Sequence, residues 1–157
     1  MDILSLTFLV AILTAGIRLA IPVLLAVLGE IITQLSGVMN LGLEGVMIVG
    51  ALAGFATTYY LEQATGLTEL AAWAGLGAGM VAGLMMGLVM AILSITCRTD
   101  QVVAGITLVL LGQSLTTYLY RALPDLSSAR VTGLASRPIP FLSNLPGAGE
   151  IFFDHDP

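Results

Sequence analysis

Four apolar runs, each about as long as a bilayer crossing, constrain the fold of this chain more than any other feature. They cover residues 3–27, 38–60, 70–95 and 102–120. A membrane-spanning α-helix needs about 20 consecutive, mostly apolar residues. Helices also satisfy their backbone hydrogen bonds internally, as the hydrocarbon core of a membrane requires. We therefore predict an all-α, polytopic membrane helix bundle, with about four spanning helices within a transmembrane region of residues 1–120.

The composition supports a membrane environment. Only 10% of the 157 residues are charged and 57% are hydrophobic, whereas a soluble domain carries about 25% charged residues. The cationic residues number five and all are arginines, against ten acidic residues. A net charge of −5 offers no basic surface for nucleic acid. We expect membrane lipid around the chain and no nucleic-acid partner.

The first apolar run contains Arg18 and Pro22, which leaves two interpretations open. Proline disrupts the interior of a helix but is tolerated in its first turn. Residues 3–27 therefore form either one kinked span, or a short segment to about Ile17 followed by a new helix from Arg18 to Leu35.

Between the first two runs lies a polar interruption, and we predict a discontinuous or re-entrant segment near residues 28–45. Ser36–Ala51 carries Asn40, Glu44 and several glycines within apolar sequence. Asn40 and Glu44 are four residues apart and would share one face of a helix. Ionisable groups in membrane segments are costly and often functional. Three glycines suit a break or close packing in this segment: Gly37, Gly42 and Gly45.

Two interpretations of the interruption remain open. Asn40 caps a helix whose first turn holds Glu44, where the helix dipole favours a carboxylate. Alternatively, a helix is broken at membrane depth and its polar side chains line a solute path, as in known transporters. Polar residues also interrupt the fourth run, where they line a path or bond to neighbouring helices. Our candidates for the path are Asn40, Glu44 and Gln113.

Glycines recur every four residues along the third run, at Gly75, Gly79, Gly83 and Gly87. This spacing places a ridge of small residues on one helical face, which lets another backbone approach closely. We interpret the ridge as a packing surface. After it, SITCRTDQ (94–101) predicts a tight turn in which Thr99 or Asp100 caps the next helix.

Residues 121–157 differ from the rest because prolines interrupt them, and we predict an extramembrane loop. Their end, IFFDHDP, resembles the approach to a further apolar span, which suggests a truncated chain. His155 between two aspartates fits a solvated terminus better than a metal site. The chain has no lysine for a phosphate-binding loop and no catalytic constellation. We expect no enzyme activity, no metal site and no cofactor.

Three sequence motifs carry a resemblance to a known family. They are GEIITQLSGVMNLGLEGVMIVGALAGF (29–55), preceded by Arg18, Ala20 and Pro22; TDQVVAGI (99–106); and the proline-containing segment 138–153. In this order they resemble ABC transporter permeases, specifically the nucleoside and simple-sugar uptake branch of the branched-chain amino acid/ribose permease family. The resemblance covers nearly the whole chain and corresponds to the N-terminal half of such a permease.

The resemblance implies a multi-pass subunit of the inner (cytoplasmic) membrane. Its implied partners are a cytoplasmic ATP-binding cassette subunit, a second permease subunit and an extracytoplasmic substrate-binding protein. It also implies that residues 121–157 are external and that the turn with Arg98 is cytoplasmic, whereas a simple count of arginines favours the reverse. The alternatives are a branched-chain amino acid permease, an ion-coupled transporter or channel that uses Glu44, and a membrane scaffold.

Overall fold

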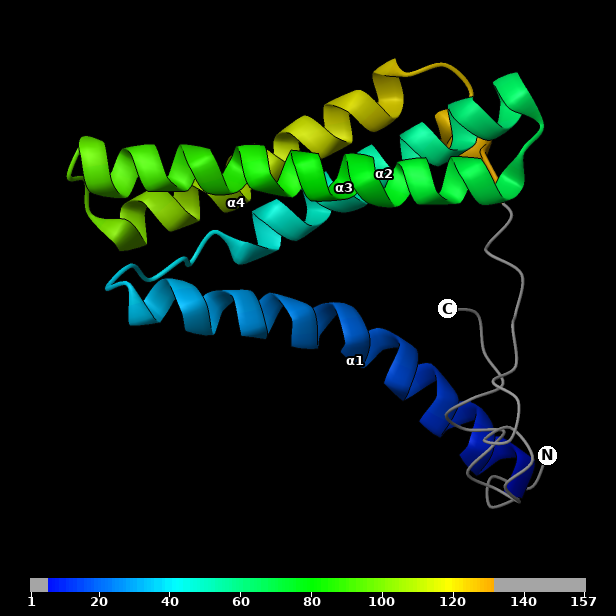
Figure 1. Cartoon of the computed structure of the whole chain (residues 1–157), viewed down its shortest axis with the longest axis horizontal. Coiled ribbons are helices and arrows are strands. Elements are labelled where there is room, and N and C mark those ends of the chain that lie inside the picture. The colour runs from blue at the N-terminus through cyan, green and yellow to red at the C-terminus, as the bar shows by residue number, and fades with distance from the viewer. Residues whose placement is uncertain (1–5, 132–157) are drawn as a thin grey trace. The chain divides into compact units, whose positions relative to one another are not determined.

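The computed structural model describes residues 6–131, and this part of the chain is helical without a β-strand. The helices are α1 (Leu6–Leu35), α2 (Leu43–Thr65), α3 (Thr68–Ala91), the π-helical turn η1 (Ile92–Thr96), α4 (Gln101–Ala122) and the 3₁₀ turn η2 (Leu126–Ser128) (Figure 1). The predicted all-α class is confirmed. The predictions made for residues 132–157, including His155 and the IFFDHDP end, lie outside the described residues.

α1 is one continuous helix, so the alternative in which a new helix begins near Arg18 is wrong. Pro22 lies inside it and cannot donate to the helical hydrogen-bond ladder. The helix nevertheless continues to Leu35, well past the expected end at residue 27. Its polar last turns stay helical, and the Gln34 amide donates to the Glu30 carboxylate at 3.1 Å, an i,i+4 pair that supports a helix. The non-helical interruption is therefore residues 36–42, shorter than the expected 28–45.

Residues 28–131 belong to one compact unit, in which α2 contacts both α3 and α4. α2 and α3 form an antiparallel hairpin, closed by Gly66 in the left-handed region (φ 69°). α2 and α4 run in the same direction, since Gly42 lies against Gly105 near their starts. Near their ends, the Tyr60 hydroxyl donates to the Pro124 carbonyl at 2.8 Å. Figure 1 shows this arrangement.

The predicted tight turn joins the end of α3 to α4. Asp100 is the N-cap of α4, and its carboxylate accepts hydrogen bonds from the N–H groups of Val102 (2.8 Å) and Val103 (3.2 Å). The prediction of a cap at Thr99 or Asp100 is confirmed for Asp100. The Thr99 hydroxyl instead donates to the Leu93 carbonyl at 2.7 Å, which closes the end of η1.

Few side chains are buried in this unit. The cluster at its centre consists of Met86, Met90, Ala104 and Leu108, with Val46, Val49 and Leu93 packed against it. Large apolar residues remain exposed along each of the four α-helices, for example Leu84 with 69% of its surface accessible. Such a surface is costly in water and matches a hydrocarbon environment. Within the described residues, four helical stretches are long and apolar enough to cross a membrane: 11–35, 43–65, 68–96 and 101–122.

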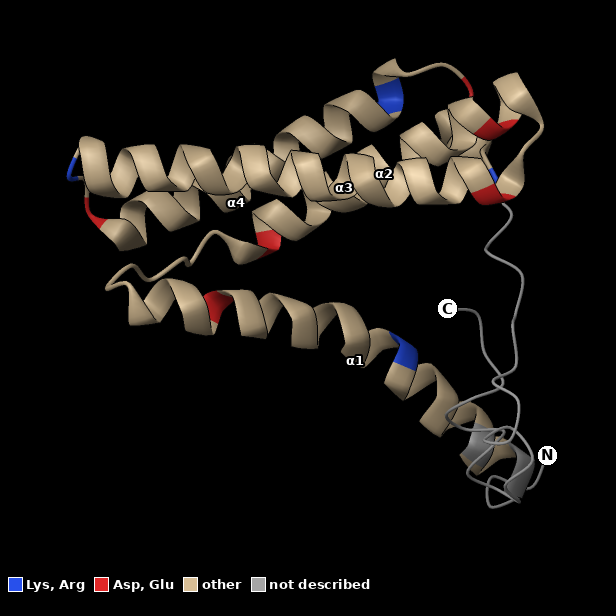
Figure 2. Cartoon of the chain, in the orientation of Figure 1, with Lys and Arg blue, Asp and Glu red and all other residues tan. Residues whose placement is uncertain are grey.

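The charged residues of the described part gather mainly near helix ends and turns (Figure 2). Arg98 and Asp100 lie in the α3–α4 turn, and Glu62 and Glu69 lie on either side of the α2–α3 turn. Charge inside a bilayer is costly, so this placement leaves the middle of each helix apolar. The exceptions are Arg18 and Glu30 within α1, and Glu44 in the first turn of α2.

Candidate functional site

The first residues of α2 lie inside the bundle rather than at its end. A Cβ atom built on Gly42 would lie 2.9 Å from the Leu108 Cβ and 3.3 Å from the Gly105 carbonyl oxygen. Because α4 begins at Gln101, the start of α2 is recessed by about 6–10 Å at the helical rise of about 1.5 Å per residue. Figure 1 shows α3 and α4 extending beyond the first turn of α2. The break in the polypeptide therefore occurs within the length of the neighbouring helices.

Residues 36–42 form the α1–α2 linker, which fills the space left by this recess. Gly37 adopts φ +80°, a conformation that favours glycine. The N–H groups of Ser36 and Gly37 donate to the carbonyls of Thr33 (3.0 Å) and Gln34 (2.9 Å). These bonds end α1 in a tight turn and direct the chain back towards α4.

Asn40 lies in the linker and not on a helix, so it shares no helical face with Glu44, and the interpretation in which Asn40 caps α2 is wrong. Gly42 is the N-cap, and as a glycine it has no side chain to accept from the first N–H groups of the helix. The Asn40 side-chain oxygen accepts from the Gly42 N–H at 3.1 Å, an Asx-type turn that precedes the helix. Asn40 therefore shapes the approach to α2 by bonding to the backbone two residues ahead.

Glu30 contacts the linker from α1. Its carboxylate accepts from the backbone N–H of Asn40 at 3.1 Å, across ten residues of sequence. The same carboxylate accepts from the Thr33 hydroxyl at 2.9 Å and from the Gln34 amide at 3.1 Å. The two flanking donors lie one turn ahead on the same helix and orient the carboxylate towards the linker.

Gln101, at the start of α4, also contacts the linker. Its side-chain oxygen accepts from the Met39 N–H at 2.8 Å, and its side-chain nitrogen donates to the Gly37 carbonyl at 3.4 Å. Gln101 is the first residue of α4 and follows the Asp100 cap. The amide thus bonds to two peptide groups of the linker from a fixed helix terminus.

Glu44 is exposed in the first turn of α2. A carboxylate at this position is favoured by the helix dipole. Because that first turn is recessed among α3 and α4, the same position also lies at a helix break inside the bundle. Glu44 therefore lies in the first turn of a helix, as one interpretation required, and beside a helix break, as the other required. Contact between Glu44 and a solute stays a prediction.

Backbone-to-backbone contact between α2 and α4 fixes this recessed start. A Cβ atom on Gly45 would lie 2.9 Å from both the Leu108 carbonyl carbon and the Val109 Cα. A Cβ atom on Gly112 would lie 2.7 Å from the Gly45 carbonyl oxygen. Real Cβ atoms do not approach backbone this closely, so neither glycine has room for a side chain. Glu44 and Gln113, the sequence neighbours of these glycines, therefore flank one helix contact.

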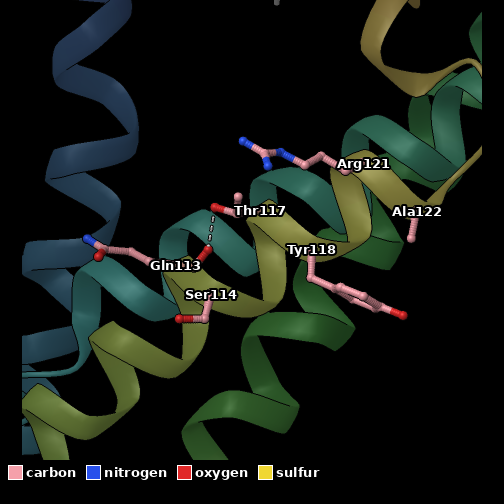
Figure 3. A pocket seen from close by; sticks show the side chains of 6 residues that line it. All are labelled: Gln113, Ser114, Thr117, Tyr118, Arg121 and Ala122. Carbon is pink, nitrogen blue, oxygen red and sulfur yellow. Dashed lines mark hydrogen bonds between the residues drawn. The ribbon is translucent and has the colours of Figure 1, made fainter.

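Gln113 begins a polar half-face on α4. Five exposed side chains, four of them polar and Tyr118 aromatic with a hydroxyl, repeat along consecutive turns of the helix: Gln113, Ser114, Thr117, Tyr118 and Arg121. Figure 3 shows these side chains along α4, together with Ala122 and the hydrogen bond from the Thr117 hydroxyl to the Gln113 carbonyl (2.8 Å). Towards the N-terminus of α4, the same face carries exposed Val103, Ile106 and Leu110. It therefore changes from apolar to polar near the middle of α4.

The four spaced glycines of α3 do not have equivalent surroundings. A Cβ atom on Gly75 would clash with the Thr58 hydroxyl and lie 2.7 Å from the Gly54 carbonyl oxygen. On Gly79 it would lie 3.1 Å from the Gly50 carbonyl oxygen. On Gly83 the nearest atom would be a Val46 methyl at 3.7 Å, and at Gly87 no described atom lies within 4 Å. The close approach of α2 is thus confined to the first two glycines.

Sequence reasoning missed Glu30 and Gln101 as partners of the linker, and Gly105 and Gly112 as partners of α2. Gly105 and Gly112 are seven residues apart, a spacing that returns to nearly the same helical face. That spacing was the available signal. Gln101 gave none, because its partner Met39 is 62 residues away in the sequence.

Comparisons with known proteins agree with a membrane permease. The sequence profile of the family described as branched-chain amino acid transport system/permease component matches residues 12–144. The chain is 38% identical over 151 residues to a protein of Haloferax volcanii with the provisional name of glucose ABC transporter permease. That comparison covers 94% of this chain and 43% of the relative.

Two further relatives have names that refer to nucleosides. The guanosine ABC transporter permease protein of Bacillus subtilis is 33% identical over 147 residues, which cover 90% of this chain and 44% of the relative. The nucleoside ABC transporter permease protein of Lactococcus lactis is 26% identical over 133 residues, with 84% and 41% covered. The chain thus spans less than half the length of these relatives. No solved structure matches it.

Proposed function

The chain belongs to the family of permease components of branched-chain amino acid transport systems, and we propose that it is a membrane-spanning subunit of an ATP-driven ABC importer for nucleosides or simple sugars. The names of its relatives in three organisms, which refer to glucose, guanosine and nucleosides, support this solute class. In this proposal the chain supplies part of the translocation path, and a partner subunit hydrolyses ATP.

The observation that carries the proposal is the recessed start of α2. Non-helical backbone at membrane depth is tolerated only where protein buries it or where it lines a water-filled cavity. Transporters use such breaks to place helix ends and polar side chains beside a solute. Here the break has Asn40 in the linker and Glu44 in the first turn of α2. Gln113 flanks the adjoining contact between Gly45 and Gly112.

The polar half-face of α4 supports a neutral, hydroxyl-rich solute. The amide of Gln113 and the hydroxyls of Ser114 and Thr117 both donate and accept hydrogen bonds, as sugar hydroxyl groups do. These three side chains are uncharged and exposed. Polar side chains on a spanning helix face a bundle interior or a water-filled cavity rather than lipid. We propose that this half-face of α4 lines the path together with Asn40 and Glu44.

A branched-chain amino acid is the second candidate solute, because the matching family takes its description from branched-chain amino acid transport. A zwitterion needs a partner for each of its charges. Glu44 would suit its ammonium group and Arg121 its carboxylate, but Arg121 lies more than two helical turns beyond Gln113 on α4. The uncharged side chains between them fit a sugar or nucleoside better.

In this proposal, the partner subunits and the orientation in the membrane are those that the permease family implies. A cytoplasmic ATP-binding cassette subunit drives the cycle, a second permease subunit completes the path, and an extracytoplasmic binding protein delivers the solute at the inner (cytoplasmic) membrane. The α3–α4 turn with Arg98 is cytoplasmic, and the segment after α4 is external. The end of the bundle with the α1–α2 linker then faces the cytoplasm, because Gln101 joins the linker to that turn.

Uptake by the assembled transporter tests the proposal. The transporter, purified with its partner subunits, is placed in liposomes with ATP inside and the binding protein outside. Radiolabelled guanosine, glucose and leucine are offered separately, with and without a protonophore. We expect ATP-dependent uptake of guanosine or glucose that the protonophore does not change. Uptake of leucine alone would favour the amino acid permease, and uptake driven by an ion gradient without ATP would contradict the ABC assignment.

A further inference from the structure

We propose that Glu30 and Gln101 are positioning residues, which hold the α1–α2 linker so that α2 begins inside the bundle with Glu44 beside the solute path. This inference rests on the proposed function for the role of the path. The part of the inference that concerns the position of the linker is independent of that function and is based on hydrogen bonds within the compact unit.

The linker backbone needs partners for its polar groups. The N–H groups of Ser36, Gly37 and Val38 use carbonyls at the end of α1. Those of Met39, Asn40 and Gly42 instead use the side chains of Gln101, Glu30 and Asn40, respectively. An unsatisfied backbone group away from water is costly, so these side chains determine where an irregular segment can lie. Glu30 and Gln101 are the two that reach the linker from outside it.

Glu30 and Gln101 bond to adjacent peptide groups from different helices. Glu30 accepts from Asn40 at 3.1 Å and Gln101 accepts from Met39 at 2.8 Å. Because one partner is on α1 and the other begins α4, both bonds can form only when the linker lies between these two helix ends. If either hydrogen bond is lost, the linker can leave the recess. The packing of Gly42 and Gly45 against α4 would then be the main contact that holds the start of α2.

The orientation of the two side chains also indicates a positioning role. The Thr33 hydroxyl and the Gln34 amide both bond to the Glu30 carboxylate, which restrains its direction. The Gln101 amide uses its acceptor on Met39 and its donor on Gly37, so a side chain of similar shape without hydrogen bonds cannot replace it. A merely solvated polar residue at a helix end would not need this arrangement.

Hydrogen exchange and uptake, measured on the assembled transporter, test the inference with variants that separate these bonds. Q101L and E30L remove the contacts to the linker. Q101E keeps the acceptor for Met39 but loses the donor to Gly37. E30Q keeps an acceptor for Asn40, while the Thr33 hydroxyl accepts from its new amide. Q63L is the matched control, because the Gln63 amide donates to the Tyr59 hydroxyl at 3.4 Å near the far end of α2 and has no bond to Glu30, Gln101 or the linker.

We expect the amides of Met39 and Asn40 to exchange about tenfold faster in Q101L and E30L, as the loss of one hydrogen bond predicts. Uptake of guanosine or glucose, per assembled transporter, should fall at least tenfold in these two variants. E30Q and Q63L should keep more than half of the uptake, and Q101E should lie between Q101L and the wild type, because it keeps the bond to Met39 and loses the one to Gly37. Recovery by the conservative variants separates positioning from a general loss of folding, which would lower the assembled amount instead.

Unchanged exchange at Met39 in Q101L would overturn the inference, as would unchanged uptake per assembled transporter in both leucine variants. If the leucine variants fail to assemble, E30Q decides the question, since uptake as low as in unassembled samples would contradict the proposal. If the wild-type transporter imports none of the offered solutes, the proposed function fails separately, and the exchange rates still test the position of the linker.

Discussion

Alanine substitutions along the glycine ridge of α3 give a graded test of the contact between α2 and α3. Gly75, Gly79, Gly83 and Gly87 lie on one helix at four-residue spacing, and the same methyl group is added at each. Only the surroundings differ. At Gly75 the new Cβ would lie 2.7 Å from the Gly54 carbonyl oxygen, at Gly79 3.1 Å from that of Gly50, and at Gly83 3.7 Å from a Val46 methyl, while at Gly87 it meets no described atom within 4 Å.

These distances set the expected free energies of unfolding. An alanine that replaces a glycine inside a helix stabilises it by about 0.5–1 kcal/mol where space is free, so Gly87→Ala and Gly83→Ala should stabilise by that amount. Forcing extra volume into a packed contact costs about 1–3 kcal/mol. At Gly75 the obstacles include a backbone carbonyl and the buried Thr58, so α2 and α3 must separate. Because the gain in helix propensity is common to both variants, the difference between Gly75→Ala and Gly87→Ala should be the packing cost alone, about 1–3 kcal/mol, with Gly79→Ala between them.

Unfolding in mixed micelles, followed by circular dichroism as the denaturing detergent is increased, measures the four free energies on one scale. Gly77→Ala is the control, because Gly77 lies on the same helix, off the ridge, with no described atom within 4 Å. Equal effects at all four ridge positions, or a larger loss at Gly87 than at Gly75, would refute the assignment of the close contact to the first two glycines.

Three further outcomes follow from the described contacts. Gly45→Ala should destabilise the chain by about 1–3 kcal/mol in the same unfolding assay, because its Cβ would lie 2.9 Å from the Val109 Cα; stability equal to that of Gly77→Ala would contradict the contact. Asp100→Ala should cost about 0.5–2 kcal/mol through loss of the α4 cap, and Asp100→Asn much less; equal losses would point to the charge instead. Glu44→Gln should lower uptake by the assembled transporter if the carboxylate acts in the path, whereas normal uptake at normal membrane levels would leave it only a structural role.

The sequence was sufficient to predict the helices, because each needs only a long apolar run and boundaries set by local chemistry. The Asp100 cap follows from a carboxylate directly before an apolar run, and its bonds reach only two and three residues ahead. The four-residue glycine spacing on α3 likewise indicated a packing face. The sequence could not show which of the four glycines contact α2, because that depends on where α2 packs against α3.

The site depended on contacts that local patterns do not reveal. Asn40 was expected on a helix because it stands four residues before Glu44, yet its oxygen bonds to the Gly42 N–H and the helix begins only at Leu43. The polar residues around Glu30 suggested an interruption, but α1 continues to Leu35, and the i,i+4 bond from Gln34 to Glu30 supports its last turns. The recessed start of α2 combines close contacts between glycines of α2 and α4 with the bonds of Gln101 and Glu30 to the linker, and no local pattern pairs these residues.

Thiol accessibility at Gln113 tests most directly the central claim that this chain lines a solute path. Gln113→Cys is compared with Leu84→Cys, an exposed position on α3, both with Cys97 replaced by serine and in the assembled transporter. We predict that a charged, membrane-impermeant thiol reagent labels position 113 and not position 84, and that the imported solute slows the labelling at 113. A cysteine at 113 that stays as unreactive as the one at 84, or that reacts at the same rate with saturating solute, would contradict the claim.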